Sequence, residues 1–477
     1  TVGAAVTSAS EVTYRGGSIT VSGNVSSTNG SVGFYSTGAS KTFSKTSATI
    51  TAAQDVTISS AASTVDTGTG AISAATVRLN SSGNMTSGAP ITSRGIVEIS
   101  SSAGNTTVSG TTNAAGNLSV VGGDVAVSAA QNTTNSRNIT INPRAAYTGT
   151  GTLNSAGTLT ISGGTAVTPT GNLAAAGNIT ISGSGQVNIT DRTVASASGN
   201  ISVSAGPTTG NALLIERTTI STTVGRIDLR ATSTNDRGVY ILGTSGGSPA
   251  RIQSNSGEIA ITGITEVATW GVQLQNNVDI TSSTGHITID AGVRGIAPGV
   301  SGTTNIGANA SGQATGNITI LADRYWWADA SSFTVLKTSG HVVVESKAGQ
   351  FSSGLNVGSV ELRNHTFSGN ASVRIGKATN NTAITITGGS TNIVGDYVIY
   401  GSAIAQDAAV TTSAGSILID PNTTYVGSGA LTASAGTVTI SGGSSVAPTG
   451  AIRALGTVTL SGTGAITNSG ATLTSLT

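Results

Sequence analysis

Residues 157–181 read GTLTISGGTAVTPTGNLAAAGNITI, and this stretch contains twice the five-residue phrase that decides the fold. The phrase is a Gly, a polar residue, an aliphatic residue, a small polar residue and a second aliphatic residue, as in Gly157–Ile161 and Gly177–Ile181. Because side chains alternate across a strand, both aliphatic side chains point to one side. Each copy therefore predicts a short, half-buried strand. We expect its leading glycine to occupy a turn that needs a positive φ.

The spacing of the phrase predicts how these strands assemble. The leading glycines are 20 residues apart from Gly157 to Gly177 and 21 residues apart from Gly415 to Gly436. A strand of five residues cannot bury its apolar face alone. Successive turns of the chain must therefore stack and pair their strands in parallel. The sequence therefore predicts an all-β fold, a right-handed parallel β-helix (β-solenoid) with coils of about 20 residues and a rod on the order of 100 Å long. Further copies start at Gly17, Gly116, Gly199, Gly225, Gly257, Gly285, Gly316, Gly340 and Gly456.

The coils are longer in the middle of the chain. The leading glycines are 32 residues apart from Gly225 to Gly257 and 31 residues apart from Gly285 to Gly316. We expect loop insertions at about 205–335, and insertions in solenoids often form the binding face.

The sequence also contains a repeat much longer than one coil. Residues 436–460 read GTVTISGGSSVAPTGAIRALGTVTL and match residues 157–181 at an offset of 279. Upstream, Pro143 and Tyr147 match Pro421 and Tyr425. We expect one continuous solenoid over 1–477, with leading coils at 1–111, one long repeat unit at 112–390 and the start of a second at 391–477. Because the sequence ends inside a repeat, we also expect a longer parent protein.

Composition excludes several classes of function. Of 477 residues, 66 are Gly, only 9% are charged, the net charge is +1 and there is no Cys. Disordered chains combine low hydrophobicity with high net charge, which this chain lacks. Nucleic-acid binding needs clustered Lys and Arg, and a membrane helix needs 18 or more apolar residues. We therefore expect no nucleic acid as partner, no membrane insertion of this segment, no thiol chemistry, no metal and no cofactor.

The repeats resemble those of the filamentous haemagglutinin-like exoproteins of Gram-negative bacteria. Leu336–Gly340, Val373–Lys377 and Val398–Gly401 also look like a long repeat of giant members of that group. The resemblance implies a parallel β-helical shaft, export through an outer-membrane partner pore, and adhesion at the cell surface. Two features depart from it. The Asn-Pro-Asn-Gly type of secretion signature is missing, since Asn142-Pro143-Arg144 and Asp420-Pro421-Asn422 differ from it, and no terminal barrel of amphipathic strands can be seen.

The candidate ligand contacts are aromatic. Trp270, Trp326 and Trp327 are the only Trp residues, and Tyr325 precedes the last two. If exposed, these rings could stack on sugars; if buried, they would pack a loop against the rod. Acidic residues are scattered in the same region, where Asp228, Asp279 and Asp290 lie near Arg226, Arg230 and Arg294, and where Asp323, Arg324 and Asp329 flank the aromatic run.

Taken together, these patterns predict an extracellular structural and adhesive shaft segment of a giant surface protein that mediates attachment or cell–cell and matrix contact. We expect it to be no enzyme and to have no catalytic residues. Its expected partners are a host or neighbouring-cell surface, a polysaccharide matrix, the secretion pore, or further copies of itself. One alternative is a self-assembling extracellular filament or sheath subunit. A second is a polysaccharide-active β-helix enzyme, which would need several carboxylates stacked on one face of neighbouring coils.

Overall fold

The computed structural model describes residues 1–38, 40–61, 63–244, 246–267, 269–298, 302–308, 314–325, 332–358, 362–363, 369–387 and 390–476. These residues form two units, Thr1–Gly206 and Pro207–Thr477. Within the described ranges the secondary structure is strand, turn and bend, with no helix. A helix long and apolar enough to cross a membrane is therefore absent from these residues.

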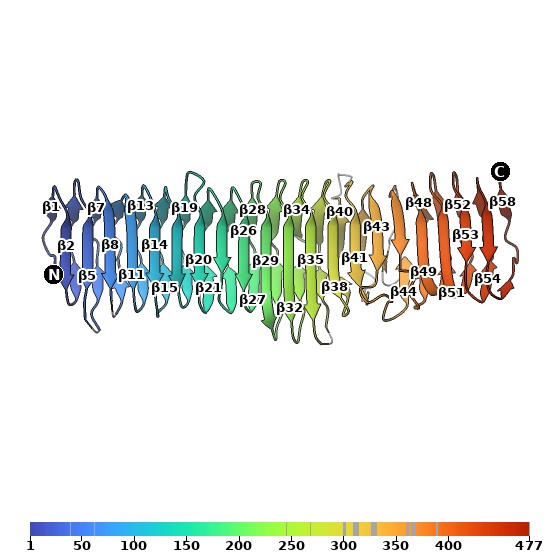
Figure 1. Ribbon diagram of the computed structural model, residues 1–477, viewed down its shortest axis with the longest axis horizontal. Coiled ribbons are helices and arrows are strands. Elements are labelled where there is room, and N and C mark those ends of the chain that lie inside the picture. Colours follow the sequence, from blue (N-terminus) through green and yellow to red (C-terminus); the bar gives the residue numbers. More distant parts are fainter. Residues whose placement is uncertain are drawn as a thin grey trace. The chain divides into compact units, whose positions relative to one another are not determined.

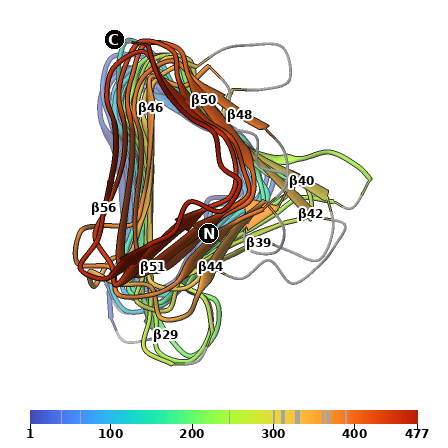
Figure 2. The same ribbon diagram turned by 90° about the vertical axis from the view of Figure 1, so that its right-hand side faces the viewer.

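In each unit the chain winds into three-sided coils (Figure 2). One coil contributes a strand to each of three faces, which we call the first, second and third face in chain order. Strands of one face, such as β2, β5 and β8 of the N-terminal unit or β32, β35 and β38 of the C-terminal unit, lie side by side (Figure 1) and pair in parallel. The predicted all-β parallel β-helix is confirmed.

The strands of the N-terminal unit are divided among the three faces. The first face contains β2 (Val12–Gly16), β5 (Val32–Ser36), β8 (Asp55–Ser60), β11 (Thr76–Ser81), β14 (Val97–Ser101), β17 (Leu118–Gly122), β20 (Ile139–Pro143), β23 (Leu159–Ser162), β26 (Ile179–Gly183) and β29 (Ile201–Thr208). The second contains β3 (Ile19–Val21), β6 (Phe43–Lys45), β9 (Val65–Asp66), β12 (Met85–Ser87), β15 (Thr106–Val108), β18 (Val125–Val127), β21 (Ala146–Gly149), β24 (Ala166–Pro169) and β27 (Gln186–Thr190). The third contains β1 (Val6–Ser8), β4 (Val25–Ser27), β7 (Ile50–Ala52), β10 (Ile72–Ala74), β13 (Ile91–Ser93), β16 (Thr112–Ala114), β19 (Gln131–Thr133), β22 (Leu153–Ser155), β25 (Leu173–Ala175) and β28 (Thr193–Ser196).

The C-terminal unit repeats the arrangement. Its first face contains β32 (Ile227–Ser233), β35 (Ile259–Thr265), β38 (Ile287–Gly292), β41 (Ile318–Ala322), β43 (His341–Glu345), β46 (Ser372–Ile375), the first halves of β49 (Tyr397–Gln406) and β51 (Ile417–Gly427), then β53 (Val438–Ser441) and β56 (Val458–Ser461). Second-position strands are β30 (Leu213–Glu216), β33 (Val239–Leu242), β36 (Val272–Gln275), β39 (Ile296–Pro298), β44 (Leu355–Gly358), β45 (Leu362–Arg363), β47 (Ile384–Ile386), the second halves of β49 and β51, β54 (Ser445–Pro448) and β57 (Ala465–Ile466). Third-position strands are β31 (Thr219–Thr222), β34 (Ala250–Ser254), β37 (Val278–Ser282), β40 (Gly302–Gly307), β42 (Ser332–Lys337), β48 (Ser390–Ile393), β50 (Ala409–Thr412), β52 (Leu431–Ala433), β55 (Ile452–Ala454) and β58 (Leu473–Ser475).

The five-residue phrase forms the strands of the first face, with the predicted alternation. In β23, Leu159 and Ile161 are fully buried and Thr160 between them is half-exposed. The register places Leu159 between Ile139 and Ile179 of the adjacent coils. Aliphatic residues therefore stack on aliphatic residues in continuous interior columns, which bury apolar surface from coil to coil.

The expectation of a positive φ at the leading glycines was wrong. None of these glycines has a positive φ. At several of them consecutive coils touch at this corner: a Cβ on Gly285 would lie 2.0 Å from the carbonyl oxygen of Gly257, and one on Gly257 would lie 1.8 Å from that of Gly225. A backbone carbonyl cannot move away from an added Cβ as a flexible side chain could. Glycine is therefore required at these positions because it has no side chain, and not because the backbone is left-handed.

A hydroxyl group three residues before the glycine links one coil to the next. The Ser282 hydroxyl donates to the carbonyl of Gly257 in the preceding coil (2.9 Å) and accepts the N–H of Gly285 (3.0 Å). Ser254 forms the same pair of bonds with Gly225 and Gly257. Since these groups are buried, the hydroxyl satisfies a donor and an acceptor that would otherwise be left unpaired.

The two copies of the long repeat have the same local geometry. Gly163 and Gly164 have φ values of 109° and 73°, and so do Gly442 and Gly443. Tyr147 and Tyr425 are both buried, opposite Val167 and Val446 respectively. Here positive φ does explain the glycines, because side chains rarely adopt this backbone conformation. The sequence repeat is therefore also a structural repeat.

One cation lies in the interior of the N-terminal unit. Lys45 is 2% exposed, and its ammonium group donates to the carbonyls of Ala48 (2.9 Å) and Gly70. Desolvation lowers the pKa of Lys45 to about 8, although the charge of Asp66 acts in the opposite direction. The two carbonyls explain how an ammonium group is tolerated in a largely apolar interior.

Candidate functional site

The candidate site lies in the C-terminal unit, at the corner where first-face strands turn into second-position strands. Four consecutive coils contribute residues here, after β35, β38, β41 and β43. Their strands are in register, since Ile259 pairs with Ile287, Ile287 with Ile318, and Ile318 with Val342. Adjacent coils are about 4.8 Å apart, so corner residues far apart in the sequence become neighbours.

Trp270 lies at this corner, directly before β36. Its side chain is half-buried, and the guanidinium carbon of Arg324 lies 4.9 Å from its ring centroid. Its backbone carbonyl accepts the N–H of Gly238 in the preceding coil (3.3 Å). The cation therefore covers a face of the indole, and the two side chains restrain each other.

Tyr325 lies beneath the same corner. It is 5% exposed, its ring packs edge-on against Phe351 with centroids 5.7 Å apart, and its hydroxyl donates to the carbonyl of Ile320 (3.2 Å). Burial raises the pKa of this phenol well above its ordinary value, and the charges of Glu345 and Asp323 act in the same direction. Tyr325 thus supports the corner from inside. The other two predicted contacts, Trp326 and Trp327, lie outside the described residues.

The corner contains a half-open cavity of about 430 Å³, which we call the corner cavity. The turn that carries Val293 and Arg294 is flanked by two glycines with positive φ, Gly292 (61°) and Gly295 (91°). On the far side, Ser352 is fixed by its N–H and hydroxyl, which both donate to the carbonyl of Asp323 (2.6 and 3.1 Å). The cavity is lined by Thr269, Val293, Arg294, Arg324, Ser352 and Ser353.

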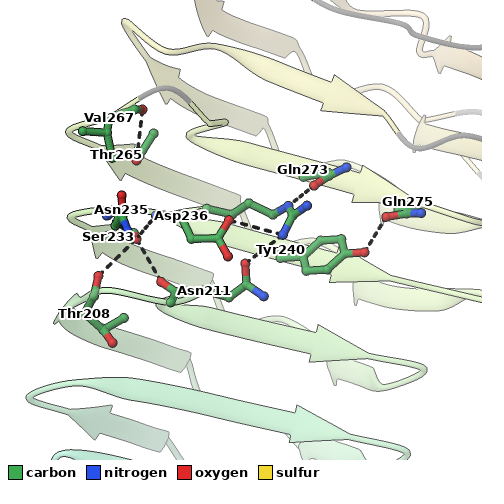
Figure 3. A network of polar contacts seen from close by, with 12 residues as sticks. Thr208, Asn211, Ser233, Asn235, Asp236, Tyr240, Thr265, Val267, Gln273 and Gln275 are labelled. Atoms are coloured by element: carbon green, nitrogen blue, oxygen red, sulfur yellow. Dashed lines mark hydrogen bonds and ion pairs between the residues drawn. The ribbon is translucent and has the colours of Figure 1, made fainter.

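A polar network extends the same corner toward lower residue numbers (Figure 3). Arg237 occupies the position before β33 that Trp270 occupies before β36. Its guanidinium group donates to Gln273, to Asn211 (3.2 Å) and to Asp236 (3.3 Å). It also lies 4.7 Å from the ring centroid of Tyr240. The Tyr240 hydroxyl donates to Gln275.

Three acidic residues of the middle region, Asp228, Asp279 and Asp290, do not lie in one row of one face. Asp228 is on β32 and bonds to Arg230 (2.8 Å), whereas Asp279 is on β37, a third-position strand, and lies 3.6 Å from Arg251. Asp290 is on β38 and pairs with Lys347. The register sets Asp290 opposite Thr262 and Asp228 opposite Ala260, so even the two first-face acids lie in different rows. Each of these carboxylates is thus bonded to or lies beside its own cation.

His286 and His341 are exposed. His286 accepts the N–H of Asn317 (3.0 Å), and His341 bonds to Ser372 (2.6 Å). No cluster of three or more His or acidic residues suited to a metal is present among the described residues. The third histidine, His365, lies outside them.

Several residues of the corner were not singled out by the sequence. Thr269, Ser352 and Ser353 belong to coils of different length, and no spacing in the sequence relates them. What these residues share is their position, because each lies shortly before a second-position strand. An alignment of the coils by strand register would therefore have identified them.

Comparisons with known proteins find no family model that matches this chain. They also find no curated protein and no solved structure with significant similarity.

Proposed function

We propose that this chain is a structural and adhesive shaft segment of a large extracellular protein of a Gram-negative bacterium. The observation that supports this most is the continuity of the ladders: within each unit, coil after coil is joined by in-register parallel strands and by the Ser–Gly corner bonds. Such a repeat adds length with each coil and needs no specialised residue to do so.

The surface composition fits the same role. Outward positions carry mainly Thr, Ser and Asn, charged residues make up 9% of the chain, and the net charge is +1. Polar, nearly neutral walls keep an apolar-cored solenoid in solution without attracting nucleic acid. Export through a partner pore and display on the cell surface rest on the resemblance to haemagglutinin-like exoproteins.

The polysaccharide-active enzyme has less support. Acid–base cleavage of a glycosidic bond by two carboxyl groups requires them to flank one bond, at about 5–9.5 Å from each other. Asp228, Asp279 and Asp290 instead lie in separate rows or on separate faces.

Surface labelling tests the proposal. Antibodies raised against this chain should label intact cells of the producing bacterium, and an in-frame deletion of its residues should lower attachment to surfaces several-fold. A periplasmic protein that is labelled only after permeabilisation serves as the control. Labelling of the chain only in permeabilised cells would overturn the extracellular role.

A further inference from the structure

Another cavity of the C-terminal unit lies on the outward side of the first face, where β43, β46 and β49 stack. The three strands pair in register through Val344, Ile375 and Ile399, so three consecutive coils contribute to it. It measures about 370 Å³, and we call it the Glu345 cavity. It is lined by Glu345, Arg374, Lys377, Ala378 and Tyr400.

The cavity lies where one position of an outward row has no side chain. Glu345, Gly376 and Tyr400 directly follow the three buried residues that pair from coil to coil, so they form one row. Gly376 has a φ of 79° and donates its N–H to the carbonyl of Val344 (2.9 Å), which holds it in the middle of the row. Glu345 and Tyr400 are two coils apart, about 10 Å, and this spacing leaves room between their side chains.

The charges around this cavity are balanced. Arg374 donates from Nη2 to Oε2 of Glu345 (3.0 Å), and the Lys377 ammonium group lies 3.7 Å from Oε1 of the same carboxylate. Asp420 of the next coil lies opposite Tyr400 in the register. Two cations therefore face two carboxylates, and this arrangement favours a neutral ligand over an anion.

Three groups of the cavity keep unused hydrogen-bonding capacity. At 3.7 Å, Lys377 is too far from Glu345 for a hydrogen bond. The Lys377 ammonium group, the Oε1 atom of Glu345 and the Tyr400 hydroxyl have no hydrogen-bond partner among the residues that the structure describes. The Lys377 and Glu345 side chains are 34% and 13% exposed, and Tyr400 is half-buried. Water can therefore satisfy these groups in the unbound protein, and a ligand can replace that water.

We infer that the Glu345 cavity binds a neutral sugar residue through two neighbouring hydroxyl groups. A hydroxyl group both donates and accepts, so one of them can donate to Oε1 of Glu345 while it accepts from Lys377. Its neighbour accepts from Arg374, whose guanidinium group has further donors. Tyr400 adds a hydroxyl and a ring face for the C–H groups of the sugar. The volume is at the lower end of ligand pockets and suits one sugar ring.

This inference rests on the proposed adhesive function and deepens it, because it assigns a chemical class to the ligand. The two can nevertheless fail separately. Binding is measured on the purified chain, whereas surface display is measured on cells.

Calorimetric titration of the 477-residue chain tests the inference. The neutral probes are cellotetraose, maltotetraose and mannotetraose. We expect at least one of them to bind at least about tenfold more tightly than its fully methylated form, which keeps the rings and cannot donate hydrogen bonds. Tetragalacturonate, which has a carboxylate on each ring, should bind no more tightly than the best neutral probe. Failure of all three neutral probes, equal binding of the methylated form, or tighter binding of tetragalacturonate would overturn the inference.

Variants locate the site. Lys377→Met should weaken binding of the neutral probe about tenfold and Tyr400→Phe about threefold, since the first removes a charged donor and the second a neutral hydroxyl. Both should leave the thermal midpoint unchanged, because neither group has a hydrogen bond to lose and a partly exposed ion pair adds little stability. The matched controls are Lys41→Met and Tyr35→Phe in the N-terminal unit, which should leave affinity unchanged. Equal weakening by the controls would contradict a built site.

Glu345→Gln distinguishes a neutral ligand from an anion. The variant removes the negative charge and keeps the shape of the side chain, so binding of the neutral probe should weaken about threefold while binding of tetragalacturonate should become tighter. Unchanged affinity for the neutral probe in Glu345→Gln and Lys377→Met would refute the assignment.

Discussion

Gly285→Val is expected to destabilise the C-terminal unit by at least about 3 kcal/mol. A Cβ on this residue would lie 2.0 Å from the carbonyl oxygen of Gly257, and the glycine of the next coil, Gly316, is packed in the same way against Gly285. No rotamer change relieves a clash with backbone. The coils must separate at this corner, which also breaks the bonds that Ser282 makes to Gly257 and Gly285.

Hydrogen exchange measured by mass spectrometry reads out this effect locally. Protection should fall around Gly257, Gly285 and Gly316, and thermal unfolding should start earlier. Gly210→Ala is the control: nothing lies within 4 Å of its Cβ position and its φ is not positive, so its stability should change by less than about 1 kcal/mol. If Gly285→Val matched this control, close stacking of glycines would not be what the corner requires.

Ile289→Asp is expected to cost more than about 4 kcal/mol, whereas Thr288→Asp should cost less than about 1 kcal/mol. Ile289 is fully buried between Ile261 and Ile320 of the neighbouring coils. Thr288 is half-exposed on the same strand, between Ala260 and Thr319. The first change places a carboxylate in an aliphatic column, and the second places it in solvent.

Urea unfolding followed by circular dichroism compares the two variants with the parent chain. Both variants add one negative charge, at adjacent residues of the same strand. The difference between their free energies of unfolding therefore measures the effect of pointing inward rather than outward. Similar losses in both variants would mean that β38 does not present alternate residues to opposite sides.

The strand pattern could be predicted from the sequence because it is strictly local. In Leu159-Thr160-Ile161 the period of two fixes which side chains are buried, and the 20-residue return to Ile179 fixes which coil stacks on which. The sequence does not predict where the longer coil from Ile227 to Ile259 places its additional residues. The structure divides them between the seven-residue β32 and the segment between β33 and β34.

The corner cavity could not be predicted because it depends on register across coils of unequal length. Trp270 attracted attention as a rare aromatic residue, yet its contact with Arg324 follows only from the alignment of β36, β39 and β41. The role of the leading glycines was also hidden, because a requirement for positive φ and a requirement for close contact select the same residue.

Disulfide formation between introduced cysteines tests the in-register stacking of coils most directly, and both functional proposals depend on that stacking. The chain has no cysteine, and Thr140 of β20 lies opposite Thr160 of β23. At about 4.8 Å between Cα atoms, the Thr140→Cys and Thr160→Cys pair should oxidise readily, whereas Thr140→Cys with Ser162→Cys, at about 8 Å, should not. Preferential oxidation of the shifted pair, or of neither pair, would contradict the parallel β-helix.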